Sequence, residues 1–233
     1  MSRWLAVSAT DGGTRTNDRF QTCHSQEEKV KGREKTPLRI GMFGGSFDPP
    51  HIGHFFCARV AAEKLGLDRL LVVPTAHQPH KLEGPFAPSE LRCRMVRALI
   101  ANDTLFELST LEIEREDISY TVDTLRDLAV AFPDPKYERY CLIGSDAFNE
   151  IDSWKDTRTI FQLARIVVLI RPGDAELEHR NRWVDRAIRI DIPKLEISST
   201  DIRQRISQGL PVNLVIGEAV DEIIKEHNLY CNH

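Results

Sequence analysis

The sequence predicts an α/β fold in which a doubly wound parallel sheet forms a single domain with a small C-terminal helical part. Two observations support this fold class. Short apolar runs alternate along the chain with longer segments of helical periodicity, the pattern of a parallel sheet covered by helices. Four of these runs end directly at Gly, at Pro or at an Arg-Pro-Gly turn, residues that commonly close a strand. A length of 233 residues is sufficient for one such core.

The first strand is predicted at 38–43, directly before the paired glycines Gly44 and Gly45. A helix follows from about Ile52, and Gly66 is a plausible end for it. The apolar residues at helical spacing are Ile52, Phe55, Phe56 and Val60.

The alternation continues to the end of the chain. The unbroken apolar run at 165–170 is typical of a strand buried on both faces. Further strands are predicted at 69–73, 106–108, 111–114, 140–143 and 190–192. Further helices are predicted after a cap at Ser89, from Thr121 to Val130, at 157–163 and 176–189, from a cap at Ser199 or Thr200 to Ser207, and at 218–227.

Composition limits the class of protein. The apolar and charged fractions, 41% and 28%, are ordinary for a globular protein. The net charge of −4 argues against a nucleic-acid partner or a basic membrane-binding patch, and no run approaches the roughly 20 apolar residues of a membrane span. The five cysteines lack CxxC spacing, so we expect reduced thiols in a cytoplasmic protein and no zinc site.

Residues 1–37 differ from the rest of the chain. They are polar, rich in Gly, Ser, Thr and charged residues, and show no apolar periodicity. This composition is typical of disorder. The sequence therefore predicts a disordered polar leader at 1–37 and one folded domain at 38–233.

The segment at 44–54, Gly-Gly-Ser-Phe-Asp-Pro-Pro-His-Ile-Gly-His, has the chemistry of a phosphate site. Glycines allow a tight turn and close approach to a ligand, and the following helix start presents free N–H groups and a positive dipole end. His51 and His54 lie three residues apart on the first turn, so both can face one side. A Walker-type GKS or GKT and a GxGxxG motif are both missing here.

A second segment, Ile-Ser-Ser-Thr-Asp-Ile-Arg at 197–203, has a similar character. Ser199 and Thr200 are typical helix-capping residues, and a helix start there offers hydroxyls and N–H groups to phosphate oxygens. Arg203 lies one turn later and adds a charge-assisted donor. Because ligands of parallel sheets bind at the carboxyl ends of strands, we expect both segments to contribute to one site.

Together the two segments reveal a resemblance to a known family. Residues 44–54 resemble the HxGH signature of the nucleotidyltransferase superfamily, in wording especially similar to bacterial nicotinate-nucleotide adenylyltransferases, and 197–203 resembles the superfamily's ISSTxIR. The resemblance covers roughly 38–230 and implies a Rossmann-like fold. It implies catalytic roles for His51, His54 and Arg203. The ATP-binding residues that it implies are Gly44, Gly45, Ser46, Phe47, His54, Gly144, Asp146, Ser198, Ser199, Thr200 and Arg203.

The same resemblance implies how the acceptor and the phosphates are held. Thr121, in a Ser-Tyr-Thr segment, corresponds to a threonine at the pyridine carboxylate. Trp154 corresponds to a ring that stacks near the nicotinate, and Arg171 to an arginine near the mononucleotide. Lys81 follows Pro-His as in the family's PPHK and is a candidate phosphate contact, although Gln78 stands where proline is usual.

The function implied is transfer of AMP from ATP to nicotinate mononucleotide, which gives deamido-NAD and pyrophosphate. Mg²⁺ is expected to be carried mainly by the ATP phosphates, with no metal ligands from the protein. Two alternatives stay open: another HxGH nucleotidyltransferase, such as one acting on phosphopantetheine, and a catalytically inactive nucleotide-binding sensor.

Overall fold

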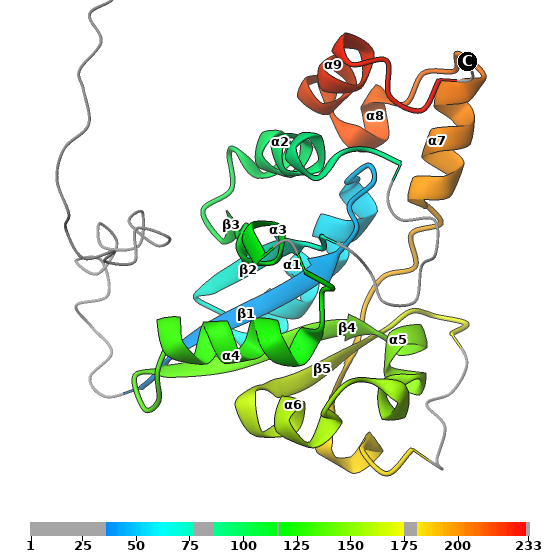
Figure 1. Ribbon diagram of the computed structural model, residues 1–233. Helices are drawn as coiled ribbons and strands as arrows, with labels where there is room; N and C mark the ends of the chain where they lie inside the picture. The colour runs from blue at the N-terminus through cyan, green and yellow to red at the C-terminus, as the bar shows by residue number, and fades with distance from the viewer. Residues whose placement is uncertain (1–35, 77–85, 116, 175–180, 232–233) are drawn as a thin grey trace, which may run out of the picture. The chain divides into compact units, whose positions relative to one another are not determined.

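The computed structural model describes residues 36–76, 86–115, 117–174 and 181–231 (Figure 1). The predicted leader, except for its last two residues, and the predicted phosphate contact Lys81 lie outside these described residues. The folded domain predicted at 38–233 contains all the elements that follow.

Six parallel strands form one sheet in the order β3-β2-β1-β4-β5-β6. Because β1 stands between β2 and β4, the chain builds the sheet outward in both directions from its first strand, the doubly wound arrangement that the sequence predicts. All carboxyl ends share one edge, where Gly45 pairs with Pro74 and Gly144 with Leu169. The strands are β1 Leu38–Gly45, β2 Arg69–Pro74, β3 Phe106–Leu108, β4 Tyr137–Gly144, β5 Arg165–Ile170 and β6 Ile188–Asp191.

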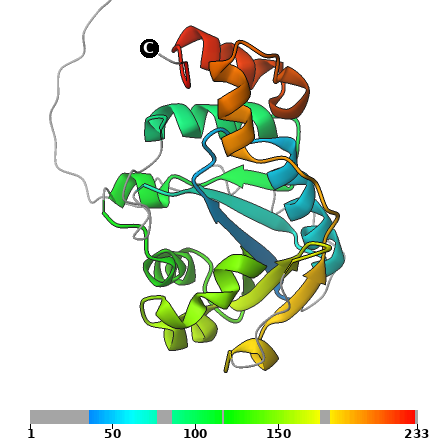
Figure 2. The same ribbon diagram turned by 90° about the vertical axis from the view of Figure 1, so that its right-hand side faces the viewer.

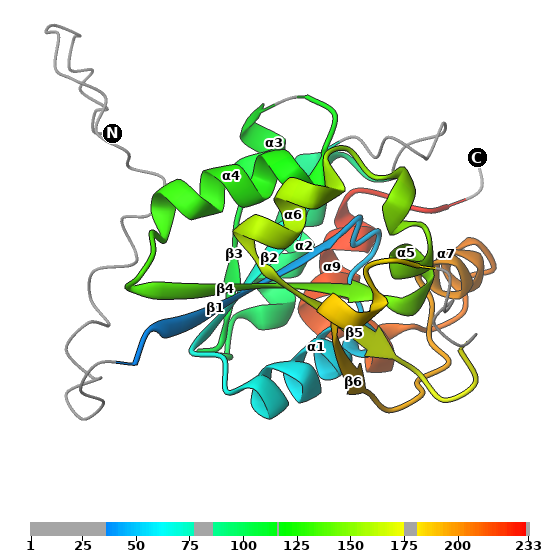
Figure 3. The same ribbon diagram turned by 90° about the horizontal axis from the view of Figure 1, so that it is seen from below.

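Helices cover both faces of the sheet. Figure 3 shows α4 (Thr121–Ala131) and α6 (Thr157–Leu163) on one side and α1 (Ile52–Leu65) on the other. The α1 side buries a continuous apolar cluster in which small residues of the helix face the strands. Members of this cluster include Ala58, Ala61, Ala62, Leu70, Val72, Leu142 and Val167.

A second, smaller core joins the C-terminal helices to the domain. The helices α7 (Ser199–Ser207), α8 (Asn213–Ile216) and α9 (Glu218–Glu226) gather beside α2 (Ser89–Ile100), as Figure 2 shows in orange and red. The residues buried between them include Met95, Ile202, Ile216, Val220 and Ile224. This is the small C-terminal helical part that the sequence predicts, and it carries the second candidate motif at the start of α7.

Two predicted elements are wrong. The segment predicted as a strand at 111–114 is the short helix α3 (Leu111–Arg115). Its alternation of apolar and acidic residues imitates a strand, but Glu112 is buried beside the Thr124 hydroxyl. The amide of Glu114 donates to the Thr110 carbonyl at 2.9 Å, which closes a helical turn.

The helix predicted at 176–189 is also wrong in its described part. After residue 180 the chain forms a 3₁₀ turn, η3 (Val184–Arg186), and then enters β6. The Trp183 ring stacks on Phe161 with centroids 4.5 Å apart, and β6 pairs with β5. Tertiary packing and sheet pairing therefore override the local helical pattern. The remaining short elements are α5 (Ser145–Asn149) and η2 (Ile151–Ser153).

Candidate active site

The turn after β1 carries the first candidate motif, and its path is fixed by burial. Phe47 has a φ of 49°, in the left-handed region, which costs a non-glycine residue about 1–2 kcal/mol. Its ring is only 1% exposed and packs in the main core, which offsets that cost. Gly44 and Gly45 lie on the more accessible side of the turn. Phe47, which the resemblance implies as an ATP contact, can therefore offer a nucleotide its backbone but not its side chain.

The two histidines of the motif lie together at the start of α1. Their rings stack with centroids 3.6 Å apart and 25° between the planes, so they share one side as their spacing predicts. The backbone N–H of His51 donates to Nδ1 of His54 at 3.3 Å. In the neutral His54 ring the proton is consequently on Nε2, which is free to act as a donor.

Both rings are neutral near pH 7. Burial and, secondarily, the positive charge of Arg171 lower the pKa of His51 to about 4. Burial, His51 and Arg171 together hold the pKa of His54 well below its ordinary value of 6.5. The histidines therefore face a ligand as hydrogen-bonding groups, while positive charge comes from arginines and from the α1 dipole.

The two motifs meet directly. The Ser199 hydroxyl donates to the Pro49 carbonyl at 2.9 Å, and Nη1 of Arg203 donates to the Asp48 carbonyl at 2.8 Å. Nη2 of Arg203 also contacts the Thr200 hydroxyl at 3.3 Å. Segments about 150 residues apart in sequence are thus joined by two hydrogen bonds at one edge of the sheet.

The cap of α7 is Ser198, not Ser199 or Thr200 as the sequence suggests. The Ser198 side chain accepts the backbone N–H of Asp201 at 3.1 Å. Because Ser198 satisfies this helix end, the Ser199 hydroxyl is free to reach the other motif. The same shift occurs at α2, where Pro88 occupies the cap position and Ser89 begins the helix. The helix α4 begins at Thr121, as the sequence predicts.

The carboxyl ends of β4 and β5 are tied together beside this turn. The Asp174 carboxylate accepts the Ser145 hydroxyl and the backbone N–H of Arg171. A Cβ at Gly144 would overlap an oxygen of the exposed Asp146 carboxylate, so a larger residue there would displace that side chain. The exposed Arg171 side chain affects the pKa of both histidines, and no hydrogen bond or ion pair within the described ranges joins it to the predicted acceptor residues.

The other two predicted acceptor residues, Thr121 and Trp154, come from the other face of the sheet, where the start of α4 meets the loop before α6 (Figure 3). Lys155 places its ammonium 4.3 Å from the centre of the Tyr120 ring and donates to Asp123 at 2.8 Å. Thr121 and Trp154 flank these contacts in the chain, and both are half-buried. The structure thus brings their two segments together.

The sequence does not single out three residues that position the turn after β1 through buried hydrogen bonds, namely Asp48, Arg92 and Tyr230. Asp48 is 3% exposed and accepts the Tyr230 hydroxyl at 2.7 Å. Arg92 is 1% exposed and donates to three carbonyls, among them Ser46 at 2.7 Å. A usable signal was the position of Arg92 three residues before buried Met95, on the apolar face of its helix. Tyr230 carries no such signal.

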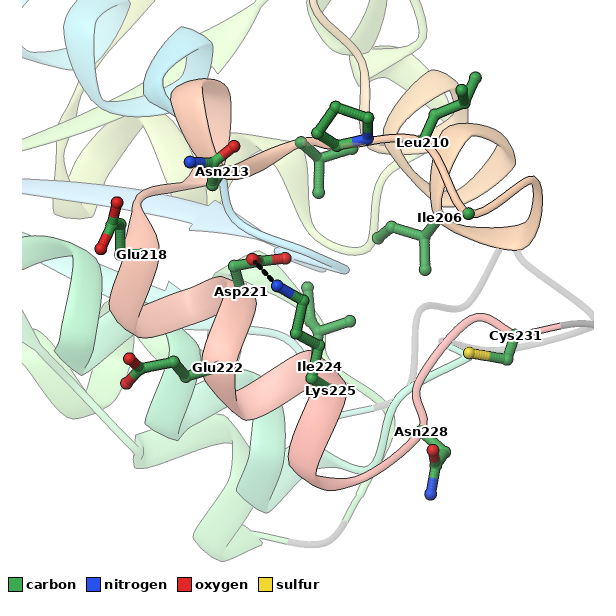
Figure 4. Close-up of a pocket in the computed structure, with 13 residues that line it drawn as sticks. Ile206, Leu210, Asn213, Glu218, Asp221, Glu222, Ile224, Lys225, Asn228 and Cys231 are labelled. Carbon is green, nitrogen blue, oxygen red and sulfur yellow. Dashed lines mark hydrogen bonds and ion pairs between the residues drawn. The ribbon is translucent and has the colours of Figure 1, made fainter.

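A groove of about 630 Å³ lies elsewhere, over the C-terminal helices (Figure 4). Asp221, Ile224 and Lys225 of α9 face Ile206 and Leu210 across it. Its lining includes no residue of either candidate motif, so the groove is separate from the strand-end site.

Comparison with known proteins gives a family. The cytidylyltransferase-like family model matches residues 42–205. A probable nicotinate-nucleotide adenylyltransferase of Thermus thermophilus is 41% identical over 193 residues, covering 83% of this chain and 100% of its own. One of Desulfitobacterium hafniense is 37% identical over 201 residues, covering 83% and 96%.

Among solved structures, the fold is similar to Plasmodium falciparum nicotinic acid mononucleotide adenylyltransferase complexed with APC. The TM-score is 0.65 and the identity 22%, over 83% of this chain and 97% of that one. The same enzyme complexed with NaAD gives a TM-score of 0.62 at 20% identity over the same shares of the two chains. These likenesses agree with the parallel sheet described above.

Proposed function

The chain belongs to the cytidylyltransferase-like family, among the nicotinate-nucleotide adenylyltransferases, and on that premise we propose that it transfers AMP from ATP to nicotinate mononucleotide. The products are deamido-NAD and pyrophosphate, a step of NAD biosynthesis. ATP and the mononucleotide are its partners, and nucleic acid and membrane are not. No helix within the described ranges has the length and apolar character to span a bilayer, and we propose that the enzyme works in the cytoplasm.

One observation carries the proposal: the two hydrogen bonds from Ser199 and Arg203 to the Asp48–Pro49 turn. They hold two helix starts, those of α1 and α7, at the carboxyl edge of a parallel sheet. Helix N-termini supply free N–H donors and a positive dipole end. A triphosphate between them would meet donors from both motifs at once.

In the proposed reaction a phosphate oxygen of the acceptor forms a bond to the α-phosphorus of ATP as the bond to the bridging β-phosphate oxygen breaks. Pyrophosphate leaves with the bonding electron pair, so no covalent enzyme intermediate is needed. We assign His51, His54 and Arg203 to the growing charge on that leaving group. Neutral imidazoles donate hydrogen bonds there, and the triphosphate charge raises the pKa values of both rings once bound.

The remaining ATP contacts are proposed from position. Gly44, Gly45 and Ser46 offer backbone groups at the end of β1, and Ser198 to Thr200 do so at the start of α7. Gly144 and the exposed Asp146 carboxylate stand at the end of β4, where a ribose hydroxyl could donate to the acid. Lys81 is a further phosphate contact that we propose from sequence alone.

We propose that Mg²⁺ enters with ATP. Within the described residues, no group of three or more His, Cys, Asp or Glu side chains is placed to hold a metal ion. The groups around the turn donate hydrogen bonds, which suits anions rather than cations. Mg²⁺ would neutralise part of the triphosphate charge, and it usually keeps phosphate and water ligands.

Acceptor choice is proposed to depend on Thr121, Trp154 and Arg171. The pyridine carboxylate would accept hydrogen bonds from N–H groups of the first turn of α4, where they have no partner within the helix. A nicotinamide amide would turn its own NH₂ towards one of those donors. A donor left buried without a partner costs about 1–3 kcal/mol, or roughly 5- to 150-fold in specificity.

The test is a comparison of kcat/KM for nicotinate mononucleotide, nicotinamide mononucleotide and phosphopantetheine at matched ATP and Mg²⁺. We expect the acid to exceed the amide and phosphopantetheine to be inert. Equal kcat/KM values for the two pyridine mononucleotides would exclude a preference for the acid. Turnover of phosphopantetheine alone would show that the chain is the alternative transferase. Release of pyrophosphate from ATP without any acceptor would contradict both transfer reactions.

His54→Ala should lower kcat by roughly 10²-fold, the usual loss for one transition-state donor. The ring also packs edge-on against Phe47, so circular dichroism must first show a folded variant. His227→Ala, at the exposed end of α9, is the matched control and should keep wild-type kcat. A folded His54→Ala protein with normal turnover excludes His54 from the mechanism.

A further inference from the structure

We propose that Tyr230 is a positioning residue for ATP, acting through its hydrogen bond to Asp48 on the turn that joins the two nucleotide motifs. The inference rests on the proposed ATP site. Tyr230 lies outside both motifs, and we assign it a role in the affinity for ATP but not for the mononucleotide.

The Asp48 carboxylate is the centre of this arrangement. It is almost fully buried and accepts three hydrogen bonds. Two come from the backbone N–H groups of Phe86 at 2.7 Å and Ala87 at 3.1 Å, and the third comes from the Tyr230 hydroxyl at 2.7 Å. A buried carboxylate needs such donors to remain charged, and Tyr230 is the donor among them that comes from a side chain.

The backbone of the same residue faces the proposed nucleotide. The Asp48 carbonyl accepts Nη1 of Arg203 at 2.8 Å, and the Arg203 guanidinium lies 4.4 Å from the centre of the Phe86 ring. The side chain of Asp48 therefore binds Tyr230, and its backbone carbonyl orients Arg203, the arginine that we assign to the leaving phosphates. Because the carboxylate and the carbonyl belong to one residue, a shift of the carboxylate would also shift the carbonyl that holds Arg203.

Tyr230 is held for this contact at some backbone cost. Its φ is 63°, and that of Asn228 is 50°, in a region that L-residues other than glycine adopt at a cost of order 1–3 kcal/mol each by general survey. The Leu229 amide donates to the Ile224 carbonyl at 2.9 Å, which anchors the segment to α9. Burial and the adjacent Asp48 charge raise the pKa of Tyr230, so the hydroxyl keeps the proton that it donates.

The acceptor half of the site does not share these contacts. Thr121 and Trp154 are positioned by the pairing of α4 with the loop before α6. Within the described part of the chain, the hydrogen bonds of Tyr230 and Asp48 do not reach either residue. Loss of the Tyr230 hydroxyl should therefore weaken ATP binding selectively. A merely structural tyrosine would lower stability and leave both substrate affinities unchanged.

The experiment compares Tyr230→Phe with Tyr140→Phe. Tyr140 is the matched control, because its hydroxyl also donates to a carboxylate, Glu138 at 2.9 Å, on β4 away from the motifs. We expect Tyr230→Phe to raise the Kd for a non-reactive ATP analogue about five- to tenfold. The KM for nicotinate mononucleotide should stay within about twofold of wild type, and Tyr140→Phe should leave both values unchanged.

A double-mutant cycle tests the route through Asp48. If Tyr230 acts by way of this carboxylate, adding Tyr230→Phe to Asp48→Asn should change the analogue Kd by less than about twofold. An unchanged Kd in folded Tyr230→Phe, or full additivity in the cycle, overturns the proposal. Because the Kd needs no acceptor, the two proposals can fail separately. A wild-type protein that binds the analogue but transfers no AMP from ATP to nicotinate mononucleotide defeats the proposed function, and its Kd values still test Tyr230. A wild-type protein that does not bind the analogue defeats both proposals.

Discussion

Arg92 shows that a single buried residue outside both motifs can hold the backbone of the candidate site in place. Its guanidinium donates to the carbonyls of Ala87, Ser46 and Thr75 at 3.1, 2.7 and 2.8 Å. A buried charge is stable only with such partners. Ser46 follows β1, whereas Thr75 follows β2 and Ala87 precedes α2 in the next connection, so one side chain from α2 fixes the mutual positions of these two connections.

Histidine protonation gives a prediction at this scale. The unfolded His51 ring takes up a proton near pH 6.5 and the folded ring only near pH 4. Between these values the unfolded state binds more protons, so stability is full above pH 6.5 and falls with acid until it levels near pH 4. From pH 7 to pH 5 this one group should remove about 2 kcal/mol of unfolding free energy.

Urea unfolding of wild type and His51→Asn at pH 7 and pH 5 measures this effect. The variant should lose about 2 kcal/mol less than wild type over the same interval. His227→Asn, which removes a half-buried imidazole outside both motifs, should retain the wild-type loss. An equal loss in His51→Asn and wild type would show that the buried ring does not control acid stability.

The sequence predicts the local geometry of the candidate site better than the environment of its residues. The stacked His51–His54 pair follows from a spacing of three on a helix. That the rings are neutral, and that the Phe47 side chain is buried, depends on residues far away in the chain. Tyr230 could not be found because its partner lies 182 residues away and no local pattern links them.

Among the elements, α7 shows the effect of a cap on a functional contact. Ser198 satisfies a free N–H at the start of this nine-residue helix, and that leaves Ser199 to bind the Pro49 carbonyl. The two adjacent serines therefore have separate tasks, one within the helix and one between the motifs.

Ser198→Ala should lower the unfolding free energy by about 1 kcal/mol, the typical value of a serine cap. In a protein of this size that corresponds to roughly 2–4 °C in Tm. Ser207→Ala, at the last position of the same helix, is the control and should change stability by less than about 0.5 kcal/mol. If thermal unfolding shows equal losses for the two variants, Ser198 does not act as the cap.

Element prediction succeeds where apolar periodicity and burial agree. The strand at 165–170 agrees residue for residue, because an unbroken Ile-Val-Val-Leu-Ile run has no other economical place than a sheet interior. In α1 the helix is correct, but Ile52 and Phe56, which match its apolar spacing, are exposed at 41% and 49%. Small alanines face the sheet there instead, since close helix–strand packing favours small side chains.

At the scale of the whole molecule, the sequence predicts the parallel sheet because alternating strands and helices leave few other arrangements. The strand order requires tertiary information, as does the cluster that joins α2 to the C-terminal helices. The sequence also predicts that the leader at 1–37 does not belong to the folded domain.

A chain that begins at Pro37 should keep the activity and the Tm of the full chain. Residues 1–36 have no apolar pattern with which to bury surface on a domain. The measurement is kcat/KM and thermal unfolding of both forms side by side. A clear fall in either quantity would mean that the leader packs on the domain or contributes to its site.

The central position of β1 also shapes the kinetics of folding. The first strand of the domain pairs with β2 after a short excursion, but its other partner, β4, lies about 100 residues further along the chain. Pairing at such separation closes a long loop before backbone hydrogen bonds compensate, which slows folding relative to proteins with local contacts. During synthesis from the N-terminus, more than half of the domain must therefore be made before β1 can pair with strands on both sides.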